Sequence, residues 1–353
     1  MARRLTLGTR GSKLALAQSE MVAARLTALH PDLEVELRVI TTRGDRVLDV
    51  ALSAVGDKGL FVKELEHALL ANEVDLCVHS CKDLPSLLPD GLVLGAFPER
   101  ADPRDVLVLP ARGDQRADSR AEARAGERAP FEGALAQGAI VGTSSLRRAC
   151  QLRALRPDLT LRDVRGNVDT RLRKLAEGQY DALVLAAAGL ERLGLLRADG
   201  SVVSDGAAFV AHLLPAEQML PAVAQGTLAI ECRAGDAATR ALLAPLDHGP
   251  TRAAALAERA FLRRLEGGCQ VPIAAHASAE GASLLLRGLV GSLDGATVVR
   301  GELAGSPGEP ETLGTALADE LLTRGAGAIL AVLATGHQAL PESSAENLRA
   351  STR

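Results

Sequence analysis

The sequence predicts an α/β protein with two lobes and a cleft, followed by a smaller C-terminal α+β domain. Three observations lead to this. Strand-like and helix-like segments alternate through the first hundred of the 353 residues. The alternation resumes after a polar stretch rich in Arg and Ala. Beyond about residue 252 the pattern changes to a helix and then consecutive strands. At this length, and 47% apolar, the chain can form two or three domains with their own cores.

The first unit alternates strands of apolar residues with helices. After a strand over 4–9, apolar residues at helical spacing predict a helix from Ser12. The segments that follow are helix 59–73 between strands 35–41 and 74–80, and then strand 91–97. Because strands that alternate with helices usually pair in parallel, we expect a parallel sheet.

The second unit starts with a strand over 105–110. The next residues, 111–138, are an Arg/Ala-rich insert without an apolar stripe, which we predict to be an exposed loop or a weak surface helix. The elements that follow are strand 139–141, helix 145–155, strand 159–164, helix 168–177, strand 182–187 and helix 190–193. Residues 220–233 supply one more strand, which can return to the first unit.

The last part of the chain has an α+β pattern. A helix over 252–265 precedes strand-like segments over 270–277, 283–293 and 297–303, which we expect to form an antiparallel meander. A helix over 311–322 and a frayed tail from Gly336 complete it. The expected domains are lobe 1 over 1–104 with about 215–235, lobe 2 over 105–214, and a C-terminal domain over 236–353.

Composition excludes several classes of function. The net charge of −4 and the 2% aromatic content, with no Trp, argue against a nucleic-acid partner. No apolar run approaches the ~20 residues that a membrane helix needs. The first residues form no signal peptide, so we expect a cytoplasmic protein. An acidic chain without a large apolar segment fits a monomer.

The five cysteines are odd in number and scattered, so we expect no disulfides. Cys77, His79 and Cys81 alternate and would share one face of a strand, as metal ligands can. No fourth ligand or second cysteine pair follows them. We therefore prefer small buried side chains there and expect no metal site.

Three strand-to-helix junctions combine hydroxyl side chains with arginines. In chain order these residues are Arg10, Ser12, Thr143, Ser144, Ser145, Arg147, Arg148, Arg165 and Arg171. Helix N-termini offer free N–H groups and partial positive charge, and Arg in a first turn opposes that charge. For a single junction, ordinary capping with solvated arginines is the better explanation. Three such junctions indicate a cleft for a polyanion, and the planar guanidinium favours carboxylates.

Two further features are candidates for chemistry. Lys82–Asp83 follows a buried strand, either as a surface ion pair before a proline turn or as a carboxylate held ionised in the same cleft. Cys269 follows two glycines at a helix end, which can present its thiol, although it can equally be one more buried cysteine.

At this point the motifs resemble the porphobilinogen deaminase family. The matching stretches include "LGTRGSKLALAQ", "HSCKDLP", "GTSSLRRACQ", "VRGNVDTRLRKL" and "LEGGCQVPIAAHA", in family order from residue 5 to about 277. The resemblance implies two lobes like periplasmic binding proteins and a third domain. It implies a transferase that joins four porphobilinogen units into the linear tetrapyrrole hydroxymethylbilane, releasing ammonia, in haem biosynthesis. None of the stretches covers the 111–138 insert or the chain beyond Gly336.

The resemblance also assigns residues. Cys269 matches the cysteine that holds a dipyrromethane cofactor through a thioether, and Asp83 matches the catalytic aspartate. The matches to cofactor- and substrate-binding positions are Arg10, Ser12, Gln18, Lys82, Thr143, Ser145, Arg147, Arg148, Arg165 and Arg171. Lys58 and Phe61 match a mobile loop near the cleft. Each pyrrole carries an acetate and a propionate, which explains the demand for cations.

The resemblance gives Lys82–Asp83 a role. Porphobilinogen becomes a methylene-pyrroleninium cation when ammonia leaves, and Asp83 would stabilise it. Unit charges ~4 Å apart at an effective dielectric near 20 interact by roughly 4 kcal/mol, or about three decades in rate. An anion-binding or effector-sensing protein would leave Asp83 and Cys269 without a role. A cysteine hydrolase would lack a recognisable base near Cys269.

Overall fold

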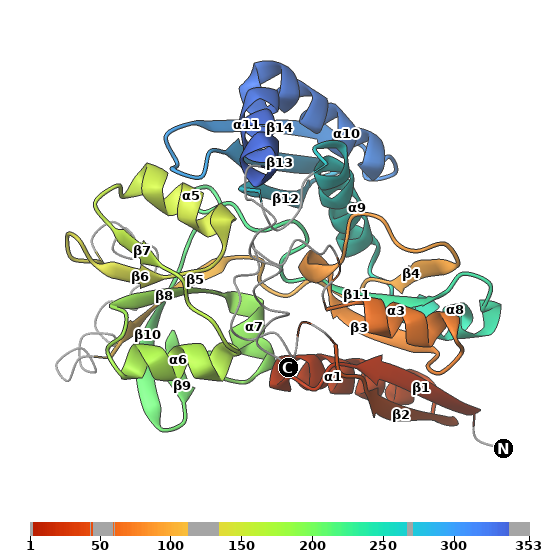
Figure 1. The fold of residues 1–353 in the computed structure, drawn as a ribbon. Helices are drawn as coiled ribbons and strands as arrows, with labels where there is room; N and C mark the ends of the chain where they lie inside the picture. The colour runs from red at the N-terminus through yellow and green to blue at the C-terminus, as the bar shows by residue number, and fades with distance from the viewer. Residues whose placement is uncertain are drawn as a thin grey trace, which may run out of the picture.

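Three sheets with their helices form the protein, seen in a computed structural model that describes residues 3–42, 44, 59, 61–111, 134–266 and 271–338 (Figure 1). The strand orders are β2-β1-β3-β11-β4, β7-β6-β8-β5-β10-β9 and β12-β13-β14. The first sheet belongs to lobe 1, the second to lobe 2 and the third to the C-terminal domain. The predicted class of two α/β lobes and a smaller α+β domain is confirmed.

Lobe 1 has a mixed sheet rather than the parallel sheet that we expected. Its elements are β1 (Arg3–Thr9), α1 (Lys13–Leu29), β2 (Leu33–Val39), α3 (Lys63–Leu70), β3 (Leu76–Ser80), the 3₁₀ turn η1 (Cys81–Asp83), β4 (Leu92–Ala96) and β11 (Leu228–Arg233). β1 pairs in parallel with β2 and β3. β11 is antiparallel because the chain returns from lobe 2 to the carboxyl end of β3, where Leu228 pairs with Ser80.

Lobe 2 is also mixed. Its elements are β5 (Asp105–Pro110), β6 (Ile140–Gly142), α5 (Leu146–Leu155), β7 (Thr160–Arg162), α6 (Val168–Ala176), β8 (Ala182–Ala186), α7 (Ala187–Arg192), β9 (Ser201–Ser204) and β10 (Ala207–Leu213). β6 is parallel to β7 and β8, whereas β5 is antiparallel to β8 and β10. The β9–β10 hairpin was not predicted.

The C-terminal domain contains the expected antiparallel meander. Its elements are α9 (Gly249–Arg264), β12 (Ile273–Glu280), β13 (Ser283–Gly291), β14 (Val298–Gly305), α10 (Pro310–Leu321), the π turn η4 (Leu322–Ala326) and α11 (Gly327–Gln338). Residues 237–246, which we expected here, form α8 (Ala237–Leu243) and η3 (Ala244–Leu246) and pack on lobe 1 through Leu243 and Leu246. The expected frayed tail lies mostly beyond the described residues, and α11 continues to Gln338.

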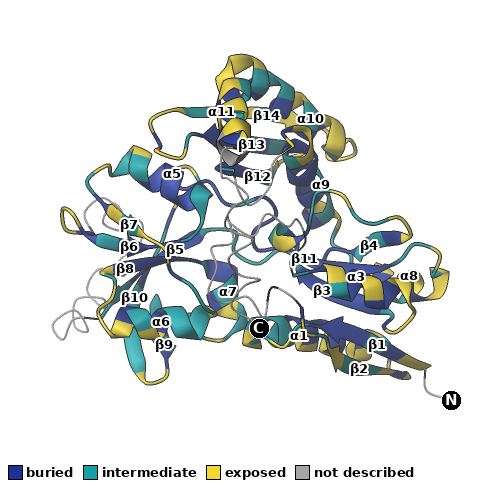
Figure 2. Cartoon of the chain, viewed as in Figure 1, coloured by how far each residue is buried: buried dark blue, intermediate teal, exposed yellow. Residues whose placement is uncertain are grey.

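The C-terminal domain contacts both lobes. α9 is largely buried (Figure 2), and its Glu258 pairs with Arg100 of lobe 1 at 2.6 Å. On the other side, Gly291 of β13 lies against Cys150 of α5, so closely that a Cβ would clash with the sulfur. The lobes also meet directly, through α1 and α7. In the part of the chain that the structure describes, no helix has the length and apolar character to cross a membrane.

Candidate active site in the cleft between the lobes

A cavity of about 810 Å³ lies between the lobes, where the carboxyl ends of β1 and β3 face the starts of α5 and α6. Among the described residues that line it, seven carry cationic side chains and three carry carboxylates. They are Arg10, Lys13, Lys82, Arg148, Arg165, Arg171 and Arg192, with Asp83, Asp169 and Asp205. The excess of positive charge favours an anionic ligand.

The start of α1 supplies the lobe 1 wall. The Ser12 hydroxyl accepts a hydrogen bond from the Ala15 N–H at 3.3 Å and caps the helix. The Arg10 guanidinium stacks 4.2 Å from the centroid of the Phe61 ring. One turn into α1, Gln18 Nε2 donates to Ser80 Oγ at 3.0 Å, which ties the helix to the end of β3. Four predicted residues, Arg10, Ser12, Gln18 and Phe61, line the cavity, and Ser80 lines it beside them.

The start of α5 carries the paired arginines. Ser145 caps the helix by accepting from the Arg148 N–H, and Thr143 Oγ1 accepts from the Ser145 N–H at 3.2 Å. Arg148 lines the cavity, whereas Thr143, Ser145 and Arg147 are not among its lining residues. The structure thus brings one of these four predicted residues to the cavity wall and places the other three behind it.

Asp105, at the start of β5, lies between the two arginines. Its carboxylate is fully buried and accepts from Arg147 Nη1 at 2.6 Å, from Arg148 Nη2 at 2.8 Å and from Gln225 Nε2 at 2.8 Å. The two guanidinium groups outweigh the effect of burial and hold the pKa of Asp105 well below its usual range. The sequence analysis expected a ligand to supply all the negative charge for these arginines, but Asp105 supplies part of it. One positive charge of this buried group remains uncompensated.

The start of α6 supplies two more cations. Gly166 adopts a φ of 104°, which lets the chain turn between Arg165 and the helix. Arg171 Nε donates to the Gly166 carbonyl at 2.8 Å. Burial, and then repulsion from Arg148 and Arg165, lower the pKa of Arg171 to about 10. An anion among these side chains would relieve that repulsion.

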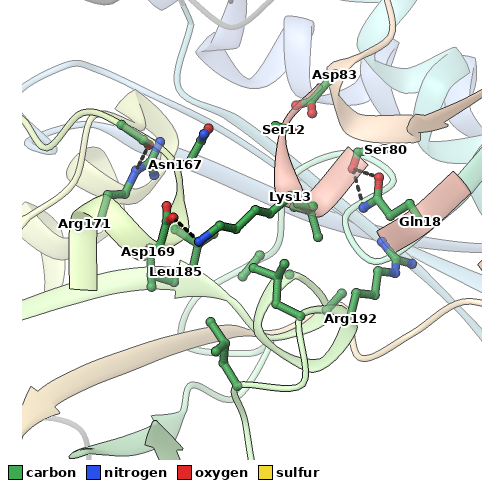
Figure 3. Close-up of a pocket in the computed structure, with 18 of the residues that line it drawn as sticks. Ser12, Lys13, Gln18, Ser80, Asp83, Asn167, Asp169, Arg171, Leu185 and Arg192 are labelled. Atoms are coloured by element: carbon green, nitrogen blue, oxygen red, sulfur yellow. Dashed lines mark hydrogen bonds and ion pairs between the residues drawn. The ribbon is translucent and has the colours of Figure 1, made fainter. Parts of the chain in front are cut away.

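Lys82 and Asp83 lie in η1, directly after β3, and both line the cavity (Figure 3 shows Asp83). Burial, together with the smaller effect of Arg148, lowers the pKa of Lys82 to about 8, and Asp83 opposes this shift. Asp83 is exposed, and no hydrogen bond or ion pair joins its carboxylate to another described residue. Its carboxylate is available to a ligand in the cleft.

Two of the seven cationic lining residues were missed by the sequence analysis. Lys13 reaches from α1 to Asp169 of α6, with Nζ 2.8 Å from Oδ2. Arg192, in α7, donates to the Gly226 carbonyl, and burial lowers its pKa to about 10. Lys13 lies in the motif "LGTRGSKLALAQ", and lysine is rare in this arginine-rich chain. Its rarity could have marked it as a candidate site residue. Arg192 lies in a helix with no such marker.

Two predicted residues, Lys58 and Cys269, lie outside the described residues. Residues 112–133, which are most of the 111–138 insert, also lie outside them. The other four cysteines are described, and all are buried. Burial raises the pKa of Cys81, Cys150 and Cys232 thiols to about 11, and that of Cys77 well above its ordinary value. These thiols are poorly suited to act as nucleophiles.

The Cys77–His79–Cys81 alternation has a structural explanation. His79 Nε2 lies 3.0 Å from Glu231 Oε2 on the neighbouring β11, and both side chains are buried. Cys81 packs in the core beneath α9. Among the residues that the structure describes, no group of three or more His, Cys, Asp or Glu side chains is placed to hold a metal ion.

Comparison with known proteins decides the family. Residues 5–241 match the family model described as porphobilinogen deaminase, dipyromethane cofactor binding domain, and residues 253–323 match the porphobilinogen deaminase C-terminal domain. The chain belongs to the porphobilinogen deaminase family. A porphobilinogen deaminase of Roseiflexus sp. (strain RS-1) is 55% identical over 331 residues, 94% of this chain and 100% of that protein. The porphobilinogen deaminase of Brevibacillus brevis is 49% identical over 92% of this chain and 96% of its own length.

Solved structures resemble the chain more remotely. The effector-binding domain of BenM, solved with its effector benzoate, is 12% identical and has a TM-score of 0.40, over 69% of this chain and 90% of that one. The family membership establishes a transferase of tetrapyrrole biosynthesis with porphobilinogen deaminase activity and a dipyrromethane cofactor. The expected family, enzyme class and cofactor are therefore confirmed.

Proposed function

We propose that this family member joins four porphobilinogen units head to tail into hydroxymethylbilane, on a dipyrromethane primer attached to Cys269 through a thioether. The observation that carries the proposal is the cleft itself, in which an exposed carboxylate, Asp83, is surrounded by the cations of both lobes. Polycarboxylate substrates require the cations, and a substrate that turns cationic during the reaction requires the carboxylate. We also propose a cytoplasmic monomer.

The residues fit the cofactor. Arg148 lies close enough to Lys82 and to Arg171 to lower the pKa of each, after the larger effect of burial, so an anion among the three is favoured. These three would bind the acetate and propionate groups of the dipyrromethane. Arg147 with Thr143 and Ser145 would support Arg148 from behind the cavity wall. When bound, the dipyrromethane supplies the nucleophilic pyrrole carbon on which the product grows.

Cys269 is favoured for attachment by contrast with the other cysteines. A thioether forms from a thiolate, and each of the four described cysteines is buried with its thiol pKa raised. In the sequence, Cys269 falls between α9 and β12, two elements of the domain that contacts both lobes. A cofactor attached there would be held by that domain.

Asp83 would act on the substrate. Porphobilinogen loses ammonia from its protonated aminomethyl group: the C–N bond breaks, its electrons leave with the ammonia, and the positive charge moves from the nitrogen to the methylene carbon and pyrrole ring. A carboxylate beside the pyrrole N–H stabilises this charge as it forms. Asp83 raises the pKa of both Lys82 and Arg171 against the effect of burial, so these two cations lie near its carboxylate in the cleft.

The remaining cleft residues would position the incoming porphobilinogen. Arg10 and Arg165 lie just before α1 and α6, and the planar guanidinium of each can bind a carboxylate through two hydrogen bonds. Phe61, under the Arg10 guanidinium, orients that side chain. Ser12 and Gln18 would donate hydrogen bonds from the lobe 1 wall. Lys58 keeps its role from the family resemblance alone.

Intact mass of the purified protein tests the proposal. We expect the polypeptide mass plus an adduct of two linked pyrroles, and we expect Cys269→Ala to have the bare polypeptide mass and no turnover. Cys232→Ala, at a buried cysteine outside the cleft, is the control and should retain the adduct. A bare mass in an active wild-type sample, or an adduct retained by Cys269→Ala, would disprove the attachment.

A further inference from the structure

The cleft holds carboxylates that a polyanion site would be expected to avoid. Asp169, in α6, and Asp205, in the β9–β10 turn, line the same cavity as the arginines. Lys13 faces both of them. Its Nζ lies 2.8 Å from Asp169 Oδ2 (Figure 3), and Asp205 acts on the same ammonium group at longer range. The lysine therefore offsets one of the two negative charges at the acidic end of an otherwise cationic cleft.

The position of Lys13 is not explained by the stability of α1. It is the first residue of the helix, directly after the Ser12 cap, where a cation opposes the helix dipole. Its side chain instead extends from lobe 1 to lobe 2, so that the Lys13–Asp169 pair bridges the two walls of the cavity. A cation at this point gains from an anionic partner, whether the protein or a ligand supplies it.

The Lys13–Asp169 ion pair is weak enough for Lys13 to exchange its partner. The Lys13 side chain is 70% exposed and that of Asp169 is 29% exposed, and solvated ion pairs of this kind are weak. Asp169 has a second partner, because its Oδ1 accepts from the Thr170 N–H at 2.8 Å. It also lies in the first turn of α6, where the helix dipole favours a carboxylate. Asp169 therefore remains stabilised when the lysine leaves.

We propose that Lys13 is a further carboxylate-binding residue of the cleft. Asp169 pairs with Lys13 until a carboxylate of the growing pyrrole chain replaces Asp169 as its partner. The proposal rests on the proposed function, since every porphobilinogen unit adds an acetate and a propionate. The other cations that line the cavity are Arg10, Lys82, Arg148, Arg165, Arg171 and Arg192, and Lys13 adds one at the acidic end. Asp169 competes with the chain for Lys13, and the two residues therefore have opposite effects on binding.

Kinetics of Lys13→Gln, Asp169→Asn and the double variant test the exchange. We expect Lys13→Gln to raise the KM for porphobilinogen about five- to tenfold, because a carboxylate contact is lost and Asp169 is left to repel the chain. Asp169→Asn should lower KM or leave it unchanged, because Lys13 is then free for the chain. The double variant should lie between the two, and Lys13→Arg should retain most of the wild-type affinity.

A second readout follows the bound chain by mass. At limiting porphobilinogen, intact-mass spectra give the fraction of enzyme carrying one to four added units. We expect Lys13→Gln to shift this distribution toward shorter chains and Asp169→Asn to leave long chains in place. Equal losses of activity in both single variants, with activity restored by the charge swap Lys13→Asp/Asp169→Lys, would show that the ion pair only holds the two lobes together. That result would overturn the proposal. An unchanged KM and distribution in Lys13→Gln would also overturn it.

Failure of this inference is separable from failure of the proposed function. Wild-type turnover of porphobilinogen and the two-pyrrole adduct test the function without reference to Lys13. Lys13 is exposed and Asp169 is partly exposed, so the Tm of both variants should stay close to that of the wild type. A wild-type protein that carries the adduct, together with unaffected Lys13 variants, would leave the function intact and remove only the role of Lys13.

Discussion

Asp105 accepts a hydrogen bond from Arg148 across 2.8 Å, in the interior directly behind the cleft wall. A second guanidinium, that of Arg147, binds the same carboxylate from the other side. Each group is nearly or fully buried, so each depends on the others for the interactions that water would otherwise provide. The arrangement holds a cleft arginine in place and retains a net positive charge for a ligand.

Replacement of Asp105 should therefore be costly for folding. We expect Asp105→Asn to lower the free energy of unfolding by about 3–5 kcal/mol, because it leaves two buried cations uncompensated. Urea unfolding followed by circular dichroism measures the change. The matched control is Asp319→Asn, which breaks the half-exposed pair with Arg264 and should cost less than about 1 kcal/mol. Equal losses in the two variants would contradict the buried-triad explanation.

Asp105 should also make the protein sensitive to acid. Its folded-state pKa lies below that of an unfolded aspartate, which is about 3.9. The stabilisation is therefore complete above about pH 4 and is lost as the pH falls from there toward the folded pKa. We expect unfolding free energies measured from pH 6 to pH 3 to fall more steeply in the wild type than in Asp105→Asn. Parallel curves would show that other carboxylates control acid unfolding.

The two arginines should differ in function. Arg148 lines the cavity, whereas Arg147 donates to Asp105 and to the Leu220 carbonyl behind it. We expect Arg148→Ala to block cofactor loading or to raise KM more than tenfold, as seen by intact mass and steady-state kinetics. Arg147→Ala should mainly lower stability, with the cofactor retained in the folded fraction. Normal loading and kinetics in Arg148→Ala would show that its charge serves Asp105 alone.

How far the sequence predicts this fold depends on the range of the interaction. The helix starts at Ser12 and Ser145 are local, because each cap bonds an N–H three residues away, and both were predicted. The β9–β10 hairpin also carries a local signal, since Asp205–Gly206 with positive φ at both residues is a preferred two-residue turn. That signal was present in the sequence and was overlooked.

Long-range pairings were less accessible. The direction of β11 depends on where the chain re-enters lobe 1, which no local pattern encodes. The same holds for Asp105, which precedes Arg147 by 42 residues, and for Asp169, which meets Lys13 from the other lobe. The sequence could identify an excess of cations around a cleft. It could not show which cations the protein itself neutralises, because that depends on contacts between distant segments.

Lys82 should give the reaction an alkaline limit. Its pKa is lowered to about 8, chiefly by burial, so the ammonium loses its charge as the pH rises through that value. We expect kcat/KM, which reports the free enzyme, to fall above about pH 8. Lys82→Arg keeps the charge and should remove this limb, while Lys63→Arg, outside the cavity lining, should not. An identical alkaline limb in Lys82→Arg would assign the limit to another group.

Asp83 carries the largest expected effect on rate. Its carboxylate has no hydrogen-bond or ion-pair partner among the described residues, so Asp83→Asn should leave the fold and the two-pyrrole adduct intact. Turnover should fall about 10²–10³-fold, because the amide cannot offset the positive charge that develops as ammonia leaves porphobilinogen. The loss should appear in kcat more than in KM, since the interaction is made in the transition state. Asp90→Asn, at an exposed carboxylate outside the cavity, is the control, and near-normal kcat in Asp83→Asn would remove the residue from the chemistry.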